Sequence, residues 1–287
     1  MAVSVSVKTG ILGTVILSTL FATSCAVDDT GTATSAVTRG ASSLDPPVAP
    51  APGRQAVLAP PTVAVAGKLV GYYEMFFGSG QPYEVAPITS GGGIPVTIFD
   101  PDATALAGLN TLFVTNQDNF GFGFGYTARL AEIQAAVQAG MILVIHDRTV
   151  SGIAGILPGG GAITALRDFT ESADINIHDG STVVTAGLDD TSMDNGNSSS
   201  HGFTFAASLP AKSKQLLSAT TPDHLVTFCY PFGKGAVIYS TIPLDFYLQG
   251  LGNDPPRTAL ATIYAPNVVR YALAGACAQR GIRPTPN

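Results

Sequence analysis

The sequence predicts an α/β fold with a mostly parallel sheet flanked by helices, a C-terminal β-hairpin and a closing helix. Three patterns predict it, namely a strand, helix and strand over residues 110–148, a hairpin pattern over residues 225–240, and helically spaced apolar residues after Pro266. Apolar runs that alternate with helical segments are typical of parallel sheets covered by helices on both faces. The composition of the 287-residue chain agrees, because 46% hydrophobic and 12% charged residues suit a packed domain.

The clearest pattern is a β-α-β unit. Residues 112–114 and 141–145 are apolar runs that predict two strands. Between them, Thr127 can cap a helix that Gly140 ends. The buried face of that helix is predicted by apolar residues at i, i+3 and i+7, which are Leu130, Ile133 and Val137. Strands joined in this way lie parallel and buried on both faces, which explains why residues 141–145 are continuously apolar.

Further elements are expected on both sides of this unit. They are strands at residues 68–73, 95–99, 225–230 and 236–240, and a short helix within residues 102–109. The last two strands flank residues 231–235, a loop with two glycines that predicts a hairpin. The final helix is expected to begin at Pro266 and to end at Gly281, and its apolar face should cover one side of the sheet.

The N-terminus has the features of an export signal. Lys8 precedes an apolar run that is too short to span a bilayer as a permanent anchor. Residues 22–25, Ala-Thr-Ser-Cys, are similar to a bacterial lipobox, in which Cys25 becomes the lipidated first residue of the mature chain. Ordinary signal cleavage near Ala26 is the alternative. We therefore expect an exported cell-envelope protein, anchored at an outer membrane or cell surface only through an N-terminal lipid.

The chain is predicted to divide into four parts. They are a signal peptide at residues 1–25, a linker at 26–62, the α/β domain at 63–283 and a tail at 284–287. The linker is rich in Pro, Ala, Ser and Thr, so it cannot bury a core and should act as an extended stalk.

Charge and cysteine usage limit the possible partners. The formal net charge is −6, from 14 Lys and Arg against 20 Asp and Glu, which argues against a nucleic-acid partner. Cys229 and Cys277 lie in apolar patterns, so they either pair as a disulfide or remain two buried thiols. Neither cysteine stands in a CxxC motif or beside a histidine, and no zinc or redox motif is present.

The order of these elements resembles a known fold family. The segments that support the likeness are residues 109–114, the helix that ends at residues 139–140, residues 142–146, and residues 233–239. Together they are similar to the class I glutamine amidotransferase-like fold, especially its ThuA-like branch. The resemblance implies a flavodoxin-like sheet over about residues 68–278, and it argues for fold more than for function.

The same resemblance implies that glutaminase chemistry is absent. Catalytic members of the family have a cysteine nucleophile on the turn after the fourth strand and a His-Pro-Glu motif after a late strand. Here those places hold residues 145–148, Ile-His-Asp-Arg, and residues 241–245, Thr-Ile-Pro-Leu-Asp. Without a thiolate and its base the amide hydrolysis cannot proceed. His146 does match a histidine found at that turn in ThuA-like proteins.

Two polar clusters are expected at the carboxyl ends of neighbouring strands, where open parallel sheets bind ligands. One consists of Asn116, Gln117, Asp118 and Asn119, and the other of His146, Asp147 and Arg148. Their amides, carboxylates and guanidinium group supply both donors and acceptors, which suits a polar small molecule or a carbohydrate. The alternative is that these residues only form turns and pair with their neighbours.

Two further sets of side chains have catalytic or metal-binding chemistry. His146, Asp147 and His201 are candidate acid-base or metal-binding groups of a saccharide-directed hydrolase, although their spacing matches no metal motif. Asp189, Asp190 and Asp194 lie in a polar loop that offers oxygen ligands for calcium, although the loop lacks EF-hand spacing. No cofactor is predicted otherwise.

The sequence favours a non-catalytic, surface-displayed domain that binds a polar ligand or carbohydrate near residues 116–119 and 146–148. An extracytoplasmic hydrolase or metal-dependent enzyme that uses His146, Asp147 and His201 is the alternative. The glycine-aromatic run at residues 120–126 either stacks on the ligand or folds back over the core.

Overall fold

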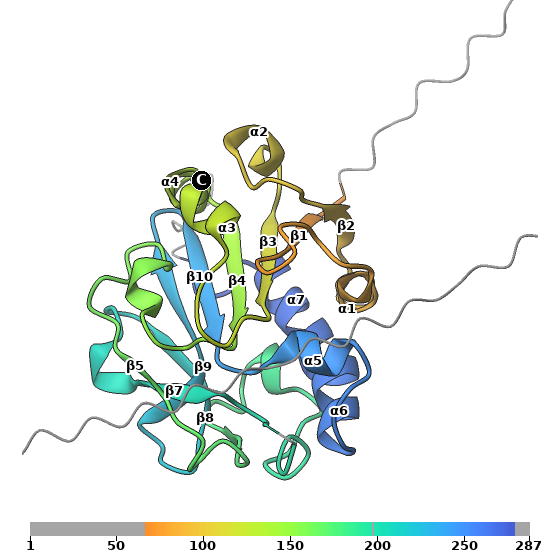
Figure 1. The fold of residues 1–287 in the computed structure, drawn as a ribbon, viewed down its shortest axis with the longest axis vertical. Coiled ribbons are helices and arrows are strands. Elements are labelled where there is room, and N and C mark those ends of the chain that lie inside the picture. Colours follow the sequence, from red (N-terminus) through yellow and green to blue (C-terminus); the bar gives the residue numbers. More distant parts are fainter. Residues whose placement is uncertain (1–66, 197, 279–287) are drawn as a thin grey trace, which may run out of the picture. The chain divides into compact units, whose positions relative to one another are not determined.

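The computed structural model describes residues 67–196 and 198–278. These residues form a mixed sheet with helices on both faces, which confirms the predicted α/β class (Figure 1). The predicted signal peptide with Cys25, the whole of the predicted linker, and the C-terminal tail lie outside the described residues. No helix in the described part of the chain is both long enough and apolar enough to cross a membrane.

The sheet has a parallel half and an antiparallel half. The parallel strands, in spatial order, are β2 (Ile94–Thr97), β1 (Leu69–Glu74), β3 (Thr111–Asn116), β4 (Ile142–Asp147) and β10 (Gly235–Ser240). The antiparallel part continues with β9 (His224–Phe232), β7 (Gly202–Phe205) and β5 (Ala165–Arg167). A branch from β9 adds β8 (Lys214–Ser218) and then β6 (Asn176–Ile177). The antiparallel strands between residues 165 and 218 were not predicted.

The helices form one layer on each face of the sheet. The first face packs against α1 (Val85–Ser90), α5 (Leu244–Leu248), α6 (Pro256–Ala259) and α7 (Ala265–Leu273). The second face packs against α2 (Ala103–Leu106), α3 (Phe124–Ala128) and α4 (Leu130–Ala139). The predicted helix within residues 102–109 is α2, and the Asp102 carboxylate caps it by accepting from the Ala105 backbone N–H at 2.8 Å.

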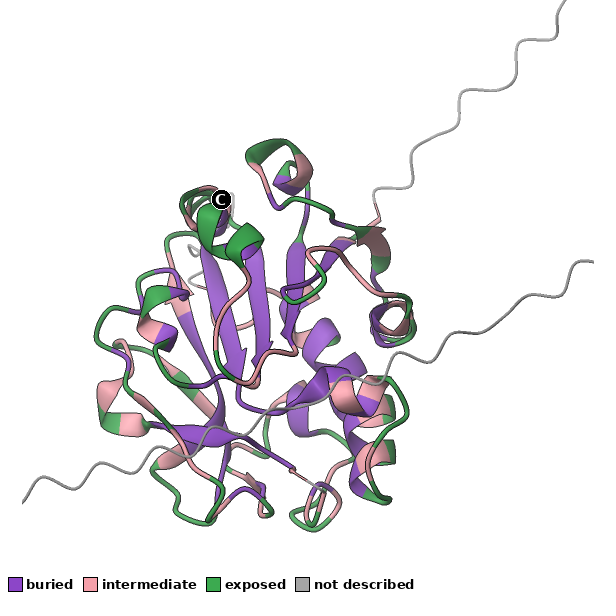
Figure 2. Cartoon of the chain, in the orientation of Figure 1, coloured by how far each residue is buried: buried purple, intermediate pink, exposed green. Residues whose placement is uncertain are grey.

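Strand β4 shows how the continuous apolar run is used. Ile142 and Val144 pack into the first face, whereas Leu143 and Ile145 pack into the second. All six residues of β4 are buried, as are those of β3 and β10, which Figure 2 shows as purple strands. Burial on both faces therefore explains the absence of polar alternation in this strand, as predicted.

The late hairpin is tighter than the predicted five-residue loop. Phe232 of β9 pairs with Gly235 of β10, so Gly233 and Lys234 alone form the turn. Pro231 remains in the strand because β9 pairs with β8 only as far as Cys229, and a proline is tolerated where a strand becomes an edge. Gly233 has φ +61°, and a side chain there would meet the Gln138 backbone, so a glycine is required at this turn.

The final helix begins earlier than Pro266. Helix α6, a π-helical turn (Leu260–Tyr264) and α7 form one continuous run, with Pro266 inside it. A proline inside a helix removes one backbone hydrogen bond and its ring pushes against the carbonyl four residues earlier. The π-helical turn directly before Pro266 makes room for that ring. The run ends at Leu273, and the predicted end at Gly281 lies outside the described residues.

Cys229 and Cys277 form a disulfide, which settles the alternative that their sequence positions left open. Cys229 lies on β9 within the core of the first face, and Cys277 follows α7. The bond therefore joins the sheet to the end of the helical layer that covers it.

Candidate functional site

The two polar clusters predicted from the sequence lie at the same edge of the sheet. Strands β3 and β4 are parallel and in register, with Asn116 opposite Asp147, so the residues that follow each strand emerge side by side. Figure 1 shows these carboxyl ends meeting the loops of the antiparallel half of the sheet. The site is therefore built between the two halves.

A cavity of about 240 Å³ opens at this edge. Its lining is Asn119, Arg148, Ser198, His201, Pro243 and Phe246. Three of these six residues, Asn119, Arg148 and His201, were candidates from the sequence. The other three come from the loop before β7 and the segment after β10.

Arg148 is fixed by a buried carboxylate. Its Nε donates to Asp245 Oδ1 at 3.0 Å, and its Nη2 donates to Asp245 Oδ2, a paired geometry that suits a guanidinium and a carboxylate. The Asp245 side chain is 1% exposed, and burial raises its pKa to about 6 although Arg148 opposes that shift. The Arg148 guanidinium also lies 5.7 Å from the centre of the Phe246 ring. The pair therefore holds a rigid polar wall beside an aromatic face.

His201 presents a neutral imidazole to the cavity. Its Nδ1 is 3.1 Å from the Arg148 backbone carbonyl, and because a carbonyl can only accept, Nδ1 has the proton. Burial lowers the pKa of His201 to about 4, so the ring is uncharged at neutral pH. In this tautomer Nε2 is an acceptor, and within the described residues it makes no hydrogen bond. The cavity thus gains an acceptor for a ligand hydroxyl.

Asn119 is oriented by a second arginine. Arg167, at the end of β5, donates from Nη2 to Asn119 Oδ1 at 3.0 Å and from Nη1 to the Arg148 carbonyl. The Asn119 amide nitrogen retains its two donors, which no other described group accepts. The cavity therefore offers donors from Asn119 and an acceptor from His201.

Asn116 and Asp147 form a buried hydrogen-bond network and do not line the cavity. Asp147 accepts from Asn116 Nδ2 at 2.9 Å, from the Tyr239 hydroxyl at 2.8 Å, and from two backbone N–H groups of the following turn. Burial still raises the pKa of Asp147, against these four donors. One of the two backbone donors is Val150, which is held at φ +61°, a rare conformation for a β-branched residue. Asp147 therefore braces the turn that positions Arg148.

His146 lies on the other face of the sheet. Consecutive residues of a strand point to opposite faces, so His146 packs between Phe113 and Tyr264 in the first face while Asp147 enters the second. Its Nε2 is 3.3 Å from the Tyr264 hydroxyl, its Nδ1 has no hydrogen-bond partner among the described residues, and burial lowers the pKa of His146 to about 3. The structure thus does not bring His146, Asp147 and His201 together.

Gln117 and Asp118 hold the loop that follows β3. Gln117 donates from Nε2 to the Tyr83 hydroxyl at 2.7 Å, and its backbone N–H donates to Glu74 at 3.2 Å. Asp118 accepts from the Phe120 backbone N–H at 2.9 Å. Neither residue lines the cavity, so their role in the site is to shape the loop that presents Asn119.

The three aspartates considered for calcium each cap backbone N–H groups. Asp190 accepts from Ile177 at 2.7 Å and Asp194 accepts from Ile175 at 2.8 Å. Asp189 accepts from the backbone N–H groups of residues 191 and 192 in its own turn. Across residues 67–196 and 198–278, no group of three or more histidine, cysteine or acidic side chains is placed to hold a metal ion.

The sequence did not reveal five residues of the site, one of which is Pro243 before α5. Asp245 and Phe246 follow β10, which is parallel to β4, so the rule that selected the ends of β3 and β4 would also have selected them. Arg167 and Ser198 belong to the antiparallel half and its loops, for which the sequence had no periodic signal. Only the folded chain brings these two residues to the carboxyl edge.

The sequence matches no protein-family profile, and no curated protein matches it. Among solved structures, the chain is similar to two cytoplasmic proteins of Salmonella typhimurium. The first has a TM-score of 0.48 and 11% identity over 71% of this chain and 97% of that one, and the second has 0.46 and 11% over 71% and 98%. It is also similar to a ThuA-like protein of Bacteroides uniformis, with a TM-score of 0.43 and 10% identity over 74% of this chain and 93% of that one.

Proposed function

We propose that this domain binds a carbohydrate or a similar polar small molecule in the cavity at the carboxyl edge of its sheet, without catalysis. The observation that supports the proposal is the lining of the cavity, which combines an amide, a guanidinium and a neutral imidazole with the Phe246 ring. Sugar hydroxyls both donate and accept, and sugar rings have apolar faces that pack on aromatic rings. A concave site with convergent polar groups is the usual form of such a binding site.

The polar side chains of the cavity are held in place by hydrogen bonds before any ligand binds. Arg148 is held by Asp245, His201 by the Arg148 carbonyl, and Asn119 by Arg167. Because these side chains are already ordered, a ligand would lose little affinity to their immobilisation. The cavity is therefore preorganised for a ligand of about one sugar ring.

The side chains at the site support a non-catalytic role. Cys229 and Cys277 are joined in a disulfide, so neither supplies a thiolate at the carboxyl edge. His146 and Asp147 are enclosed in opposite faces of the core, and His201 has no carboxylate among its described hydrogen-bond partners. An acid-base pair aimed at the cavity is absent from the described residues.

Phe246→Ala is expected to weaken sugar binding by about tenfold or more, because it removes the aromatic face of the cavity. Titration calorimetry of the purified protein against a panel of neutral and acidic mono- and oligosaccharides would measure the affinities. Phe99→Ala is the matched control, since Phe99 is 75% exposed and follows β2 at the far edge of the sheet. If no sugar binds the wild-type protein, or if both variants behave alike, the proposal is wrong.

We also propose that the protein is exported and lipid-anchored through Cys25. The disulfide supports export, because such bonds persist in oxidising compartments. Cys25→Ala is expected to move the protein from the membrane fraction to the soluble fraction, because the variant lacks the cysteine that would be acylated. Fractionation with an immunoblot checks this prediction. A variant that stayed in the membrane fraction would contradict the lipid anchor.

A further inference from the structure

Arg167 contacts two residues that line the cavity and forms no ion pair within the described residues. Its described contacts are the Arg148 carbonyl, the Asn119 side-chain oxygen and the Phe169 ring, whose centre lies 5.0 Å from the guanidinium. The ion pairs formed by arginines in the described chain belong to Arg129, Arg148 and Arg257. A guanidinium has five N–H donors, and Arg167 uses two of them.

The carboxylate whose charge acts on Arg167 is the buried Asp147, but the two residues form no ion pair within the described chain. Arg148 is neutralised by Asp245, and His201 is uncharged at neutral pH. The neighbouring acid in sequence, Asp168, is partly exposed and accepts from the Thr170 backbone N–H within its own turn. Asp147 already accepts from four other donors, so the unused N–H donors of Arg167 remain available to an anionic ligand.

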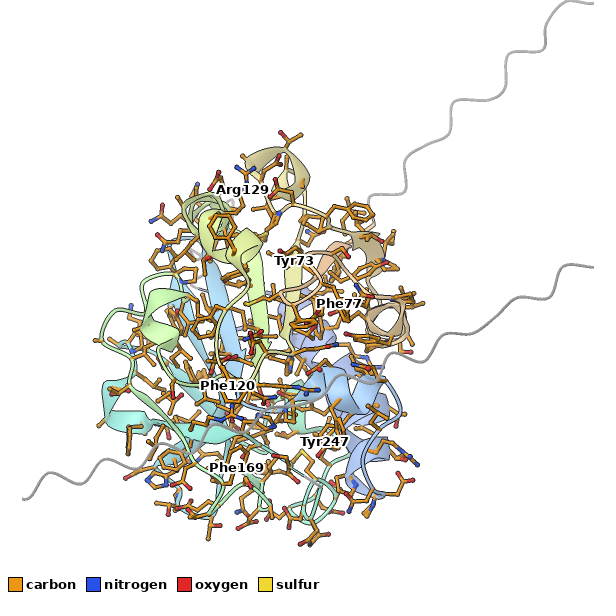
Figure 3. The ribbon with its side chains drawn as sticks, viewed as in Figure 1. Tyr73, Phe77, Phe120, Arg129, Phe169 and Tyr247 are labelled. Atoms are coloured by element: carbon orange, nitrogen blue, oxygen red, sulfur yellow. A yellow bond between two sulfur atoms is a disulfide. The ribbon has the colours of Figure 1, made fainter. Side chains whose placement is uncertain are left out.

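Exposed aromatic rings extend the site beyond the cavity. Phe169 is 52% exposed, and its ring contacts the His201 ring edge-on with 5.4 Å between centroids. Phe120 follows Asn119 directly and is 95% exposed. Figure 3 shows Phe120 and Phe169 at the same end of the domain, away from Arg129. A cavity of about 240 Å³ suits one ring, so these aromatic rings offer contacts to neighbouring rings of a longer ligand.

We propose that the cavity selects an acidic oligosaccharide, one with a uronate-type carboxylate, and that Arg167 is the residue that recognises the carboxylate. A planar carboxylate matches the parallel N–H donors of a guanidinium, which gives direction as well as charge. The inference rests on the proposed carbohydrate-binding function and deepens it by naming the ligand class and a specificity-determining residue.

The test compares an acidic ligand with its methyl ester, in which each charged carboxylate becomes a neutral ester. Titration calorimetry of the purified protein would use tetragalacturonate and its fully methyl-esterified form at about pH 7. We expect the acid form to bind about tenfold more tightly, and its affinity to fall with added salt while that of the ester does not. The salt dependence needs no variant, so it remains informative if a substitution impairs folding.

Arg167→Gln is expected to weaken the binding of both ligands, because Arg167 also orients Asn119, but to weaken that of tetragalacturonate about tenfold more than that of the ester. Arg129→Gln is the matched control, because Arg129 pairs with Asp100 and Glu132 on the surface near α4. This control should leave both affinities unchanged. Thermal unfolding of each variant checks that it is folded.

Three outcomes would overturn the inference. If Arg167→Gln weakens both ligands alike, Arg167 only holds the shape of the cavity. If neutral sugars bind while the acid form has no advantage, the choice of an acidic ligand is wrong although the proposed function stands. If no saccharide binds in any form, the inference and the proposed function both fail.

Discussion

Loss of the Cys229–Cys277 disulfide is expected to lower the free energy of unfolding by about 4 kcal/mol, since the bond closes a loop with a sequence separation of 48 residues. In the chain-entropy account, a cross-link of this span removes many conformations from the unfolded chain. The two ends belong to different layers, because Cys229 is on β9 and Cys277 follows α7. No neighbouring contact would replace the bond by restricting the same loop.

The folded state also gains from the position of the bond. Cys229 is fully buried, and the backbone nitrogen of Cys277 lies 3.4 Å from the sulfur of Cys229. Cys277 packs against the core of the first face, where α7 covers β4. Without the disulfide, this end of the chain would lose its covalent link to the sheet and keep its packing and the turn hydrogen bonds of residues 274–278.

Thermal unfolding with and without reductant measures the effect. For a domain of this size, about 4 kcal/mol corresponds to a decrease in Tm of roughly 8–16 °C. The double variant Cys229→Ala, Cys277→Ala should show the lower Tm in both conditions, which separates the disulfide from other effects of the reductant. A wild-type Tm that did not change, although both thiols had become titratable, would contradict the prediction.

The parallel half of the sheet could be predicted because its signals are local. Buried strands β3 and β4 are continuous apolar runs, and the helix between them has its apolar residues on one face and ends at Gly140. Gly140 has φ +130°, a conformation that favours glycine, so the end of the helix was also encoded locally. Each of these features depends on a few adjacent residues.

The antiparallel half could not be predicted because its strands have little periodicity of their own. β6 has two residues and β5 has three, which is too short for an alternating pattern to develop. Their pairing is determined by contacts with β7 and β8, far away in the sequence. Because Arg167 belongs to β5, the local sequence pattern could not identify it as a residue of the proposed site.

The failure of the His146 and Asp147 constellation has a simpler physical cause. Adjacent residues of a strand point to opposite faces of the sheet. Because β4 extends through Asp147, the side chains of His146 and Asp147 lie on opposite faces. The strand predicted from the sequence ended at Ile145, which placed both residues in one loop. An error of two residues at a strand end was enough to combine a core histidine with a turn-bracing aspartate.

Raising the pH from about 6.5 to about 8 is expected to lower the free energy of unfolding by about 1 kcal/mol, because Glu84 is held protonated in the folded state. Glu84 is fully buried in the 3₁₀ turn Pro82–Glu84, next to α1. Burial raises its pKa from 4.5 to about 8, and the carboxylates of Glu74 and Asp245 add to the shift. The unfolded chain thus loses this proton near pH 4.5 and the folded chain near pH 8.

The sign follows from which state holds the proton. Between those two pKa values the folded state binds one more proton than the unfolded state, so stability falls as the pH rises. Burial lowers the pKa of His146 to about 3 and that of His201 to about 4, and they act in the opposite direction. At pH 6.5 the unfolded histidines are still half protonated, so they offset part of the decrease between about pH 6.5 and 8, and the difference between the wild-type protein and Glu84→Gln isolates the contribution of Glu84.

Glu84→Gln is expected to remove this slope while preserving the fold. Glu84 contacts the Thr115 hydroxyl at 2.7 Å and accepts from the Gln81 backbone N–H at 3.1 Å. A glutamine can donate its amide N–H to Thr115 and accept from Gln81 through its oxygen, as the protonated acid does. Urea unfolding at several pH values measures the slope, with Glu132→Gln on the surface of α4 as the control. An unchanged slope in Glu84→Gln, or stability that rises with pH across the window, would show that Glu84 is ionised in the folded protein.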